Sequence, residues 1–186
     1  MYVMKERALA YEAATKQDIE QMRSLLREAL EAGAVGFSTG RSDNHRTSEG
    51  KDTPAANASH EELTGLAQAF QGLSHGVIQM VSDYNLLKGP SEFDAEFDLV
   101  EAMATASGKA LSLTWLQRDP GGEQFVRIQE RVDQAVAKGL PLFMQTAARG
   151  IGVLNGLDAS FHPFMGFPSY KEVAHLPLDK RAEALR

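Results

Sequence analysis

Four times along the chain, an amphipathic helical pattern runs into a glycine and then into a short apolar run. The four apolar runs are VGFSTG, GVIQMVS, ALSLTWLQ and LPLFMQTA. Strands that alternate with helices of about ten to twenty residues need crossover connections, so they lie parallel and pack against the helices. The sequence therefore predicts an α/β fold with a parallel sheet, in which functional residues follow the carboxyl ends of the strands.

Capping residues and glycines mark where the predicted helices begin and end. Thr15 with Asp18, and Ser59 with Glu62, have the spacing of a capping box at a helix N-terminus. Residues 148–168 are rich in Gly, Phe and Pro and predict a loop. We expect strands at 35–39, 77–81, 111–116 and 142–146, and helices between residues 15 and 33, 59 and 76, 93 and 108, 125 and 139, and from about 178 onward.

The number of predicted strands is too small for a complete barrel. The chain has 186 residues, whereas a closed eight-stranded βα barrel typically needs about 250, and a smaller flavodoxin-like sheet needs fewer. A helix precedes the first strand and another follows the last, so we favour a partial TIM-like (β/α)8 barrel over residues 15–186, with an irregular N-terminal edge at 1–14. Its edge strands would leave backbone groups unpaired, so we expect the chain to self-associate or to need the rest of a barrel.

Composition narrows the classes of partner. The net charge is −6 and the chain has no cluster of Lys and Arg, which argues against nucleic acid or an anionic membrane as the main partner. The chain has no cysteine, which excludes a disulfide framework and fits a reducing cytosol. The N-terminus lacks the apolar region of a signal peptide, and no stretch approaches the roughly 18 apolar residues of a membrane span. We therefore expect a cytoplasmic protein.

The long polar segment after the first predicted strand holds the main candidate site. Arg41, His45 and Arg46 lie there with Asp43, and long loops after strands are often functional. A histidine and two guanidinium groups are suited to binding a substrate carboxylate or polarising a carbonyl group. We expect His45 to be catalytic and Arg41 and Arg46 to bind substrate, and the alternative interpretation is a solvated polar loop.

Other polar residues lie in or just after the predicted strands. Ser38 has a hydroxyl that can bond either a ligand or the local backbone. Gln117 and Gln145, like Gln79, place amides in or beside apolar strands, where a buried amide needs partners. These amides are interpreted either as ligand contacts inside a barrel or as members of a structural network. Ser38, Gln117, Gln145 and Arg149 complete the predicted substrate-binding set.

The five histidines are scattered and predict no metal site by spacing. There is no HxH or HExxH motif and no pair of histidines at helical spacing. A GxSxG elbow and a phosphate-binding P-loop are absent as well. The residues alone therefore name no metal ligand.

Several segments of the sequence resemble those of a known family. The run MRSLLREALEAGAVGFSTGRSDNHR, followed by HEELTGLAQAF and GVIQMVSDY, is similar to the amidohydrolase superfamily and, within it, to the N-acyl-D-amino-acid deacylase branch. The similarity continues through four less specific segments: LSLTWLQ, LPLFMQTAARGIGVL, HPF and SYKEV.

This resemblance implies a TIM-like barrel with a zinc centre that hydrolyses the linear amide bond of N-acyl-D-amino acids. The chain would correspond to about strands 4 to 7 of the parent barrel, and its partner would be a small-molecule substrate, an N-acyl amino acid. Where typical members carry metal-binding histidines on two of these strands, this chain has Val81 and Trp115, which cannot ligate zinc. The resemblance then implies that residues outside this chain hold the zinc, and that the chain alone is inactive.

Two other functions stay open at this point. One is a non-catalytic βα module that binds a small anion over the strand ends. The other is a half-barrel whose exposed edges assemble with a partner chain or with a second copy.

Overall fold

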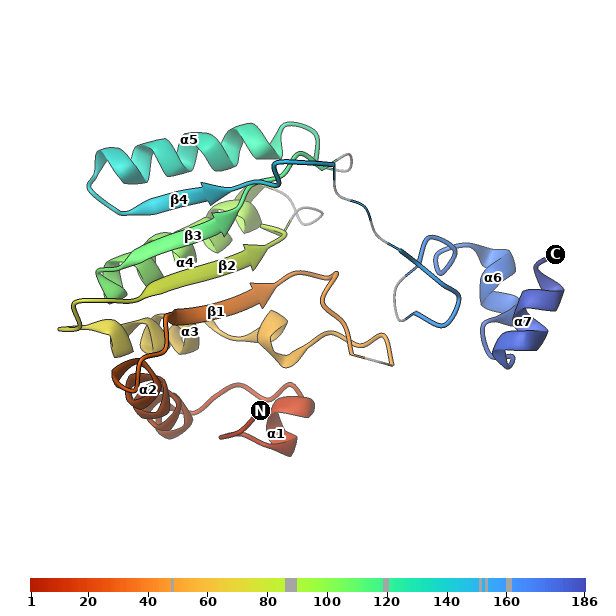
Figure 1. Ribbon diagram of the computed structural model, residues 1–186, viewed down its shortest axis with the longest axis horizontal. Helices are drawn as coiled ribbons and strands as arrows, with labels where there is room; N and C mark the ends of the chain where they lie inside the picture. The colour runs from red at the N-terminus through yellow and green to blue at the C-terminus, as the bar shows by residue number, and fades with distance from the viewer. Residues whose placement is uncertain (48, 86–89, 119–120, 151, 153, 160–161) are drawn as a thin grey trace. The chain divides into compact units, whose positions relative to one another are not determined.

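The computed structural model describes residues 1–186 except 48, 86–89, 119–120, 151, 153 and 160–161 (Figure 1). The chain divides into two compact units. The first unit comprises Met1–Ser42 and Pro54–Thr146, and the second comprises Asp43–Thr53 and Ala147–Arg186. The sheet described below lies entirely in the first unit.

A four-stranded parallel sheet forms the centre of the first unit. The strands are β1 (Gly36–Arg41), β2 (Val77–Ser82), β3 (Ala110–Thr114) and β4 (Leu142–Gln145). Their order across the sheet is the order along the chain, β1-β2-β3-β4, and every neighbouring pair is parallel. The predicted α/β fold with a parallel sheet is therefore confirmed. β1 extends two residues beyond its predicted end, which brings Arg41 into the strand.

Each strand is preceded by a helix. Helix α2 (Lys16–Glu31) leads to β1, α3 (His60–Ala67) to β2, α4 (Pro90–Ser107) to β3 and α5 (Gln124–Ala137) to β4. Two 3-10 turns, η1 (Pro54–Asn57) and η2 (Gln68–Phe70), flank α3. The repeating unit is thus a helix followed by a strand, four times over.

Local capping explains why two of these helices begin where they do. The Thr15 hydroxyl accepts a hydrogen bond from the Asp18 amide at 3.2 Å, and the Asp18 carboxylate accepts one from the Thr15 amide at 2.8 Å. The Ser59 hydroxyl accepts from the Glu62 amide at 3.1 Å. Gly139 follows α5 with a φ of 88°, a conformation that glycine adopts without steric cost. The predicted helix boundaries are confirmed at these points.

One face of the sheet carries the hydrophobic core. Side chains that alternate along the strands, such as Ile78, Met80, Leu111, Leu113 and Leu142, are buried in one cluster with apolar side chains of α2, α3, α4 and α5. Figure 1 shows α3 and α4 against this side of the sheet, with α2 beside β1 and α5 beside β4. All four helices therefore cover the same face.

The opposite face of the sheet has no buried side chain among its residues, all of which are described. We call this surface the uncovered face. The register places its residues side by side across the four strands. They are Gly36, Ser38 and Gly40 of β1, Val77, Gln79 and Val81 of β2, Ala110, Ser112 and Thr114 of β3, and Phe143 and Gln145 of β4.

Three shorter helices complete the described structure. Residues 1–14, expected to be irregular, contain the single-turn helix α1 (Glu6–Leu9). The second unit contains α6 (Pro168–Val173) and α7 (Leu178–Ala184). Helix α7 begins where the sequence predicts the terminal helix, whereas α6 was not predicted. In the described part of the chain, no helix is both long enough and apolar enough to span a bilayer.

Candidate functional site

The carboxyl ends of the parallel strands form the candidate site of the first unit, because all four strands end at the same edge of the sheet. Polar side chains at this edge come from the ends of β1 and β2 and from the segment after β3. Two ion pairs, Arg41 with Glu96 and Asp83 with Arg118, connect these residues.

The first ion pair joins Arg41, at the end of β1, to Glu96 of α4. The Arg41 Nε donates to the Glu96 Oε1 at 2.7 Å, and the Ser82 hydroxyl donates to the same oxygen at 2.9 Å. The Glu96 side chain is 2% exposed and the Arg41 side chain 15% exposed. A second Arg41 nitrogen, Nη1, donates to the Ala58 carbonyl. Most of the Arg41 guanidinium is therefore used within the fold.

The second carboxylate oxygen of Glu96 is buried and has no hydrogen-bond partner within the described structure. Its charge lies beside Tyr84, which is also buried. Burial, with a smaller contribution from the Glu96 charge, raises the pKa of the Tyr84 hydroxyl well above its usual value. Tyr84 thus stays neutral at physiological pH, and its hydroxyl donates to the Thr114 carbonyl at 3.2 Å.

The second ion pair joins Asp83, just after β2, to Arg118, which follows β3. The Ser42 hydroxyl, just after β1, donates to the Asp83 Oδ1 at 3.1 Å. Gln124, at the start of α5, donates its side-chain amide to the backbone carbonyl of Asp83 at 3.4 Å. Asp83 therefore connects the segments that follow β1, β2 and β3. Neither Asp83 nor Arg118 was in the predicted site, although their position after a strand was the signal that could have found them.

The predicted residues of the first long loop fall in different units. Arg41 belongs to the first unit, whereas His45 and Arg46 belong to the second. His45 is exposed. The Arg46 guanidinium donates to the Gly50 carbonyl at 3.0 Å and lies 3.1 Å from the Asp52 carboxylate. Arg46 is thus paired inside its own loop.

Two predicted substrate-binding residues, Gln117 and Arg149, have exposed side chains. Arg149 lies in the second unit and donates to the carbonyl of the next residue, Gly150, at 3.2 Å. Gln117 follows β3 in the first unit, and its side chain is exposed. Both are accessible to a small molecule from solvent.

Ser38 and Gln145 lie on the uncovered face. The Ser38 hydroxyl donates to the Gln79 side-chain oxygen at 2.6 Å. The Ser112 hydroxyl donates to the Gln145 side-chain oxygen at 3.4 Å. The amides of Gln79 and Gln145 therefore form cross-strand pairs with hydroxyl groups, which fits the structural-network interpretation of these residues.

Val81 and Trp115 take different positions around the sheet. Val81 is half-buried on the uncovered face. Trp115 packs against the hydrophobic core, and its indole N–H donates to the Phe125 carbonyl at 2.8 Å. Within the described part of the chain, no group of three or more His, Cys, Asp and Glu residues could hold a metal ion. The side chains described here thus do not fit a zinc centre on their own.

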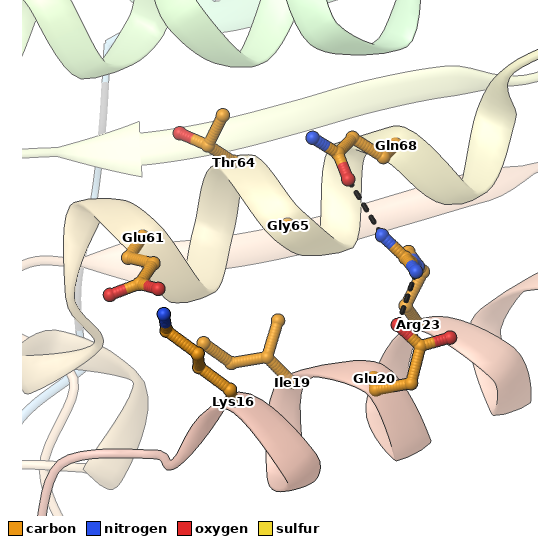
Figure 2. Close-up of a pocket in the computed structure, with 8 residues that line it drawn as sticks. All are labelled: Lys16, Ile19, Glu20, Arg23, Glu61, Thr64, Gly65 and Gln68. Carbon is orange, nitrogen blue, oxygen red and sulfur yellow. Dashed lines mark hydrogen bonds and ion pairs between the residues drawn. The ribbon is translucent and has the colours of Figure 1, made fainter.

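A groove of about 300 Å³ lies between α2 and α3, on the helix-covered side of the sheet (Figure 2). The Arg23 guanidinium crosses it, donating to the Gln68 side-chain oxygen at 2.7 Å and pairing with Glu20. The two helices approach closely at Gly65, where an added Cβ would lie 2.5 Å from the Ile19 Cγ2. The groove holds none of the predicted site residues and is bridged by its own side chains.

Comparison with known proteins does not assign the chain to a family. No family model, curated protein or solved structure matches it.

Proposed function

We propose that this chain is a segment of a TIM-like barrel from a metal-dependent amidohydrolase that cleaves the linear amide bond of N-acyl-D-amino acids. The observation that supports the barrel is the arrangement of the sheet: four parallel strands in chain order, with every covering helix on one face. A doubly wound sheet instead reverses its strand order and has helices on both faces. The family resemblance of the sequence supports the reaction.

His45 is the proposed general acid or base. It is exposed on a polar loop, and a histidine can transfer a proton near neutral pH. In the first unit, the substrate carboxylate is proposed to bind those nitrogens of Arg41 that the fold does not already use. Arg46 and Arg149 are proposed as substrate-binding residues of the second unit. Ser38, Gln117 and Gln145 are proposed as further polar contacts of the substrate. The zinc is proposed to be held mostly by residues outside this chain, because no group of three or more His, Cys, Asp and Glu among the described residues could hold a metal ion.

The ion pairs at the strand ends bear on the rival function, a non-catalytic anion-binding module. At this edge, Arg41 faces the carboxylate of Glu96 and Arg118 faces that of Asp83. Any anion bound at this edge, including a substrate carboxylate, would have to compete with these carboxylates. The ion pairs therefore do not separate the two functions, and the family resemblance of the sequence is what places the hydrolase first.

The test is an activity assay of the longer natural polypeptide that contains this segment. Turnover of a panel of N-acyl D- and L-amino acids is measured with and without added zinc. We expect metal-dependent hydrolysis of the D-series, and a loss of about tenfold or more for His45→Ala. His60→Ala is the matched control, because His60 is exposed in the first turn of α3. Hydrolysis of neither series, or equal rates for His45→Ala and wild type, would refute the proposal.

A further inference from the structure

The two edges of the sheet carry backbone groups that pair with no neighbouring strand among the described residues. Within that part of the chain, β1 pairs with β2 alone and β4 with β3 alone. The carbonyl of Pro141, just before β4, accepts a hydrogen bond from the amide of Leu111 in β3. The carbonyl of Gln145, at the end of β4, accepts one from the amide of Trp115, just after β3. Because successive residues of a strand direct their backbone groups to opposite sides, the N–H and C=O of Met144 point to the outer edge. By the same alternation, Gly36, Ser38 and Gly40 point outward from β1.

A pairing of β4 of one copy with β1 of another would form a new seam between two strands. The helices are arranged so that this seam would be covered. Each strand has its own preceding helix, and α2, which precedes β1, lies at the β1 edge, whereas α5 lies at the β4 edge (Figure 1). If the β1 of a second copy paired with β4, its α2 would accompany it and cover the new seam as α3, α4 and α5 cover the others. Two copies would supply eight strands and eight covering helices, the number in a closed βα barrel.

The uncovered face has the composition of a barrel interior. It contains no charged side chain, although 24% of the chain is charged. Its β1 edge is small, with Gly36, Ser38 and Gly40, whereas its β4 edge carries Phe143, which is 57% exposed. A solvated edge would normally be protected by charged residues. Small residues on one edge and a large one on the other favour pairing of β1 with β4.

We propose that two copies of this chain pair β4 of each with β1 of the other and close an eight-stranded barrel. Twofold symmetry makes both seams identical, so both edges of both sheets are paired at once. The occupant is a second copy because the uncovered face offers no charge for a charged partner and the two edges complement each other. The proposal concerns this chain by itself and rests on its sheet, not on the hydrolase reaction; in a longer polypeptide that supplies its own remaining barrel strands, those strands would take the same two edges.

The test is the mass of the purified chain in solution, measured by light scattering and sedimentation over a wide range of concentration. We expect twice the chain mass of 20.3 kDa. Phe143→Glu places a charge inside the barrel and should halve the mass while leaving the circular dichroism unchanged, because Phe143 is exposed in the single chain. A wild-type mass of one chain, or open-ended polymers in place of a closed dimer, would overturn the proposal.

A pair of variants at Met144 separates edge pairing from stacking of the two uncovered faces. Met144→Pro removes the outward N–H, and proline is tolerated where a strand N–H points away from its neighbour. Met144→Ala removes the same side chain but keeps the N–H. Edge pairing predicts that Met144→Pro halves the mass and Met144→Ala does not. A dimer that survives Met144→Pro yet is lost in Phe143→Glu would show face-to-face stacking and refute the barrel.

Discussion

Replacement of Glu96 by alanine tests how the strand ends are stabilised. Glu96 is 2% exposed, and its carboxylate accepts hydrogen bonds from Arg41 at 2.7 Å and from Ser82 at 2.9 Å. Removing one partner of a buried ion pair costs about 3–5 kcal/mol, because the other charge stays desolvated. The Arg41 side chain is 15% exposed and retains its bond to the Ala58 carbonyl. We therefore expect Glu96→Ala to lower the free energy of unfolding by about 3 kcal/mol, the lower end of that range.

The assay is urea unfolding followed by tryptophan fluorescence. The chain has a single tryptophan, Trp115, which packs against the core of the first unit and therefore reports on that unit. Asp98→Ala on the same helix is the matched control. Asp98 is 69% exposed and pairs with Arg131 at 2.7 Å, and an exposed pair contributes at most about 1 kcal/mol.

A double variant decides whether the cost comes from the unpaired charge. Arg41→Met with Glu96→Met removes both charges and keeps comparable volume, and such replacements are often neutral or stabilising by about 1–4 kcal/mol. We expect the double variant to be more stable than Glu96→Ala. The reasoning would be refuted if Glu96→Ala lowered the free energy of unfolding by less than about 1 kcal/mol. It would also be refuted if the double variant were no more stable than Glu96→Ala.

Two further predictions concern backbone packing and pH. Gly36→Ala would place a Cβ 2.0 Å from the Val77 carbonyl oxygen and should cost about 1–3 kcal/mol in urea unfolding; an unchanged urea midpoint would contradict the packing. Hydrogen bonds, chiefly from Arg7 and then from the Thr15 amide, lower the pKa of Asp18 from 3.8 to about 2. This stabilisation is present above about pH 4 and is lost towards pH 2, so Asp18→Asn should lower the urea midpoint at pH 7 and match wild type near pH 2. A deficit that is the same at both pH values would contradict the ion-pair origin.

The parts of the fold that the sequence predicts correctly are encoded locally. The hydroxyls of Thr15 and Ser59 and the amides they bind are three residues apart, so the signal for each helix start lies within one turn. The alternation of apolar runs and glycines is equally local, and it predicts four parallel strands in the right places. Helix α6 was not predicted because it has only six residues and begins where the Gly- and Pro-rich segment 148–168 ends, so its apolar period is too short to detect.

The partners within the candidate site depend on distant residues and could not be predicted. Arg41 and Glu96 are 55 residues apart, and nothing near Arg41 in the sequence indicates that a buried carboxylate of α4 neutralises it. Arg118 and Asp83 are separated by 35 residues and come together because β2 and β3 are neighbours. Position after a strand predicts which residues gather at this edge, but the choice of partner is made by tertiary packing.

The distribution of charge over the first unit separates the question of assembly from the question of chemistry. Charged side chains gather at the strand ends, where carboxylates neutralise Arg41 and Arg118, and the uncovered face carries none. A substitution on that face, such as Phe143→Glu, should therefore change the mass without touching a proposed catalytic group. His45 lies on a loop outside the sheet, so His45→Ala, which should lower the turnover of the longer polypeptide, should leave the mass of this chain unchanged. If His45→Ala changed the mass as well, the separation of the assembling sheet from the loop of His45 would be wrong.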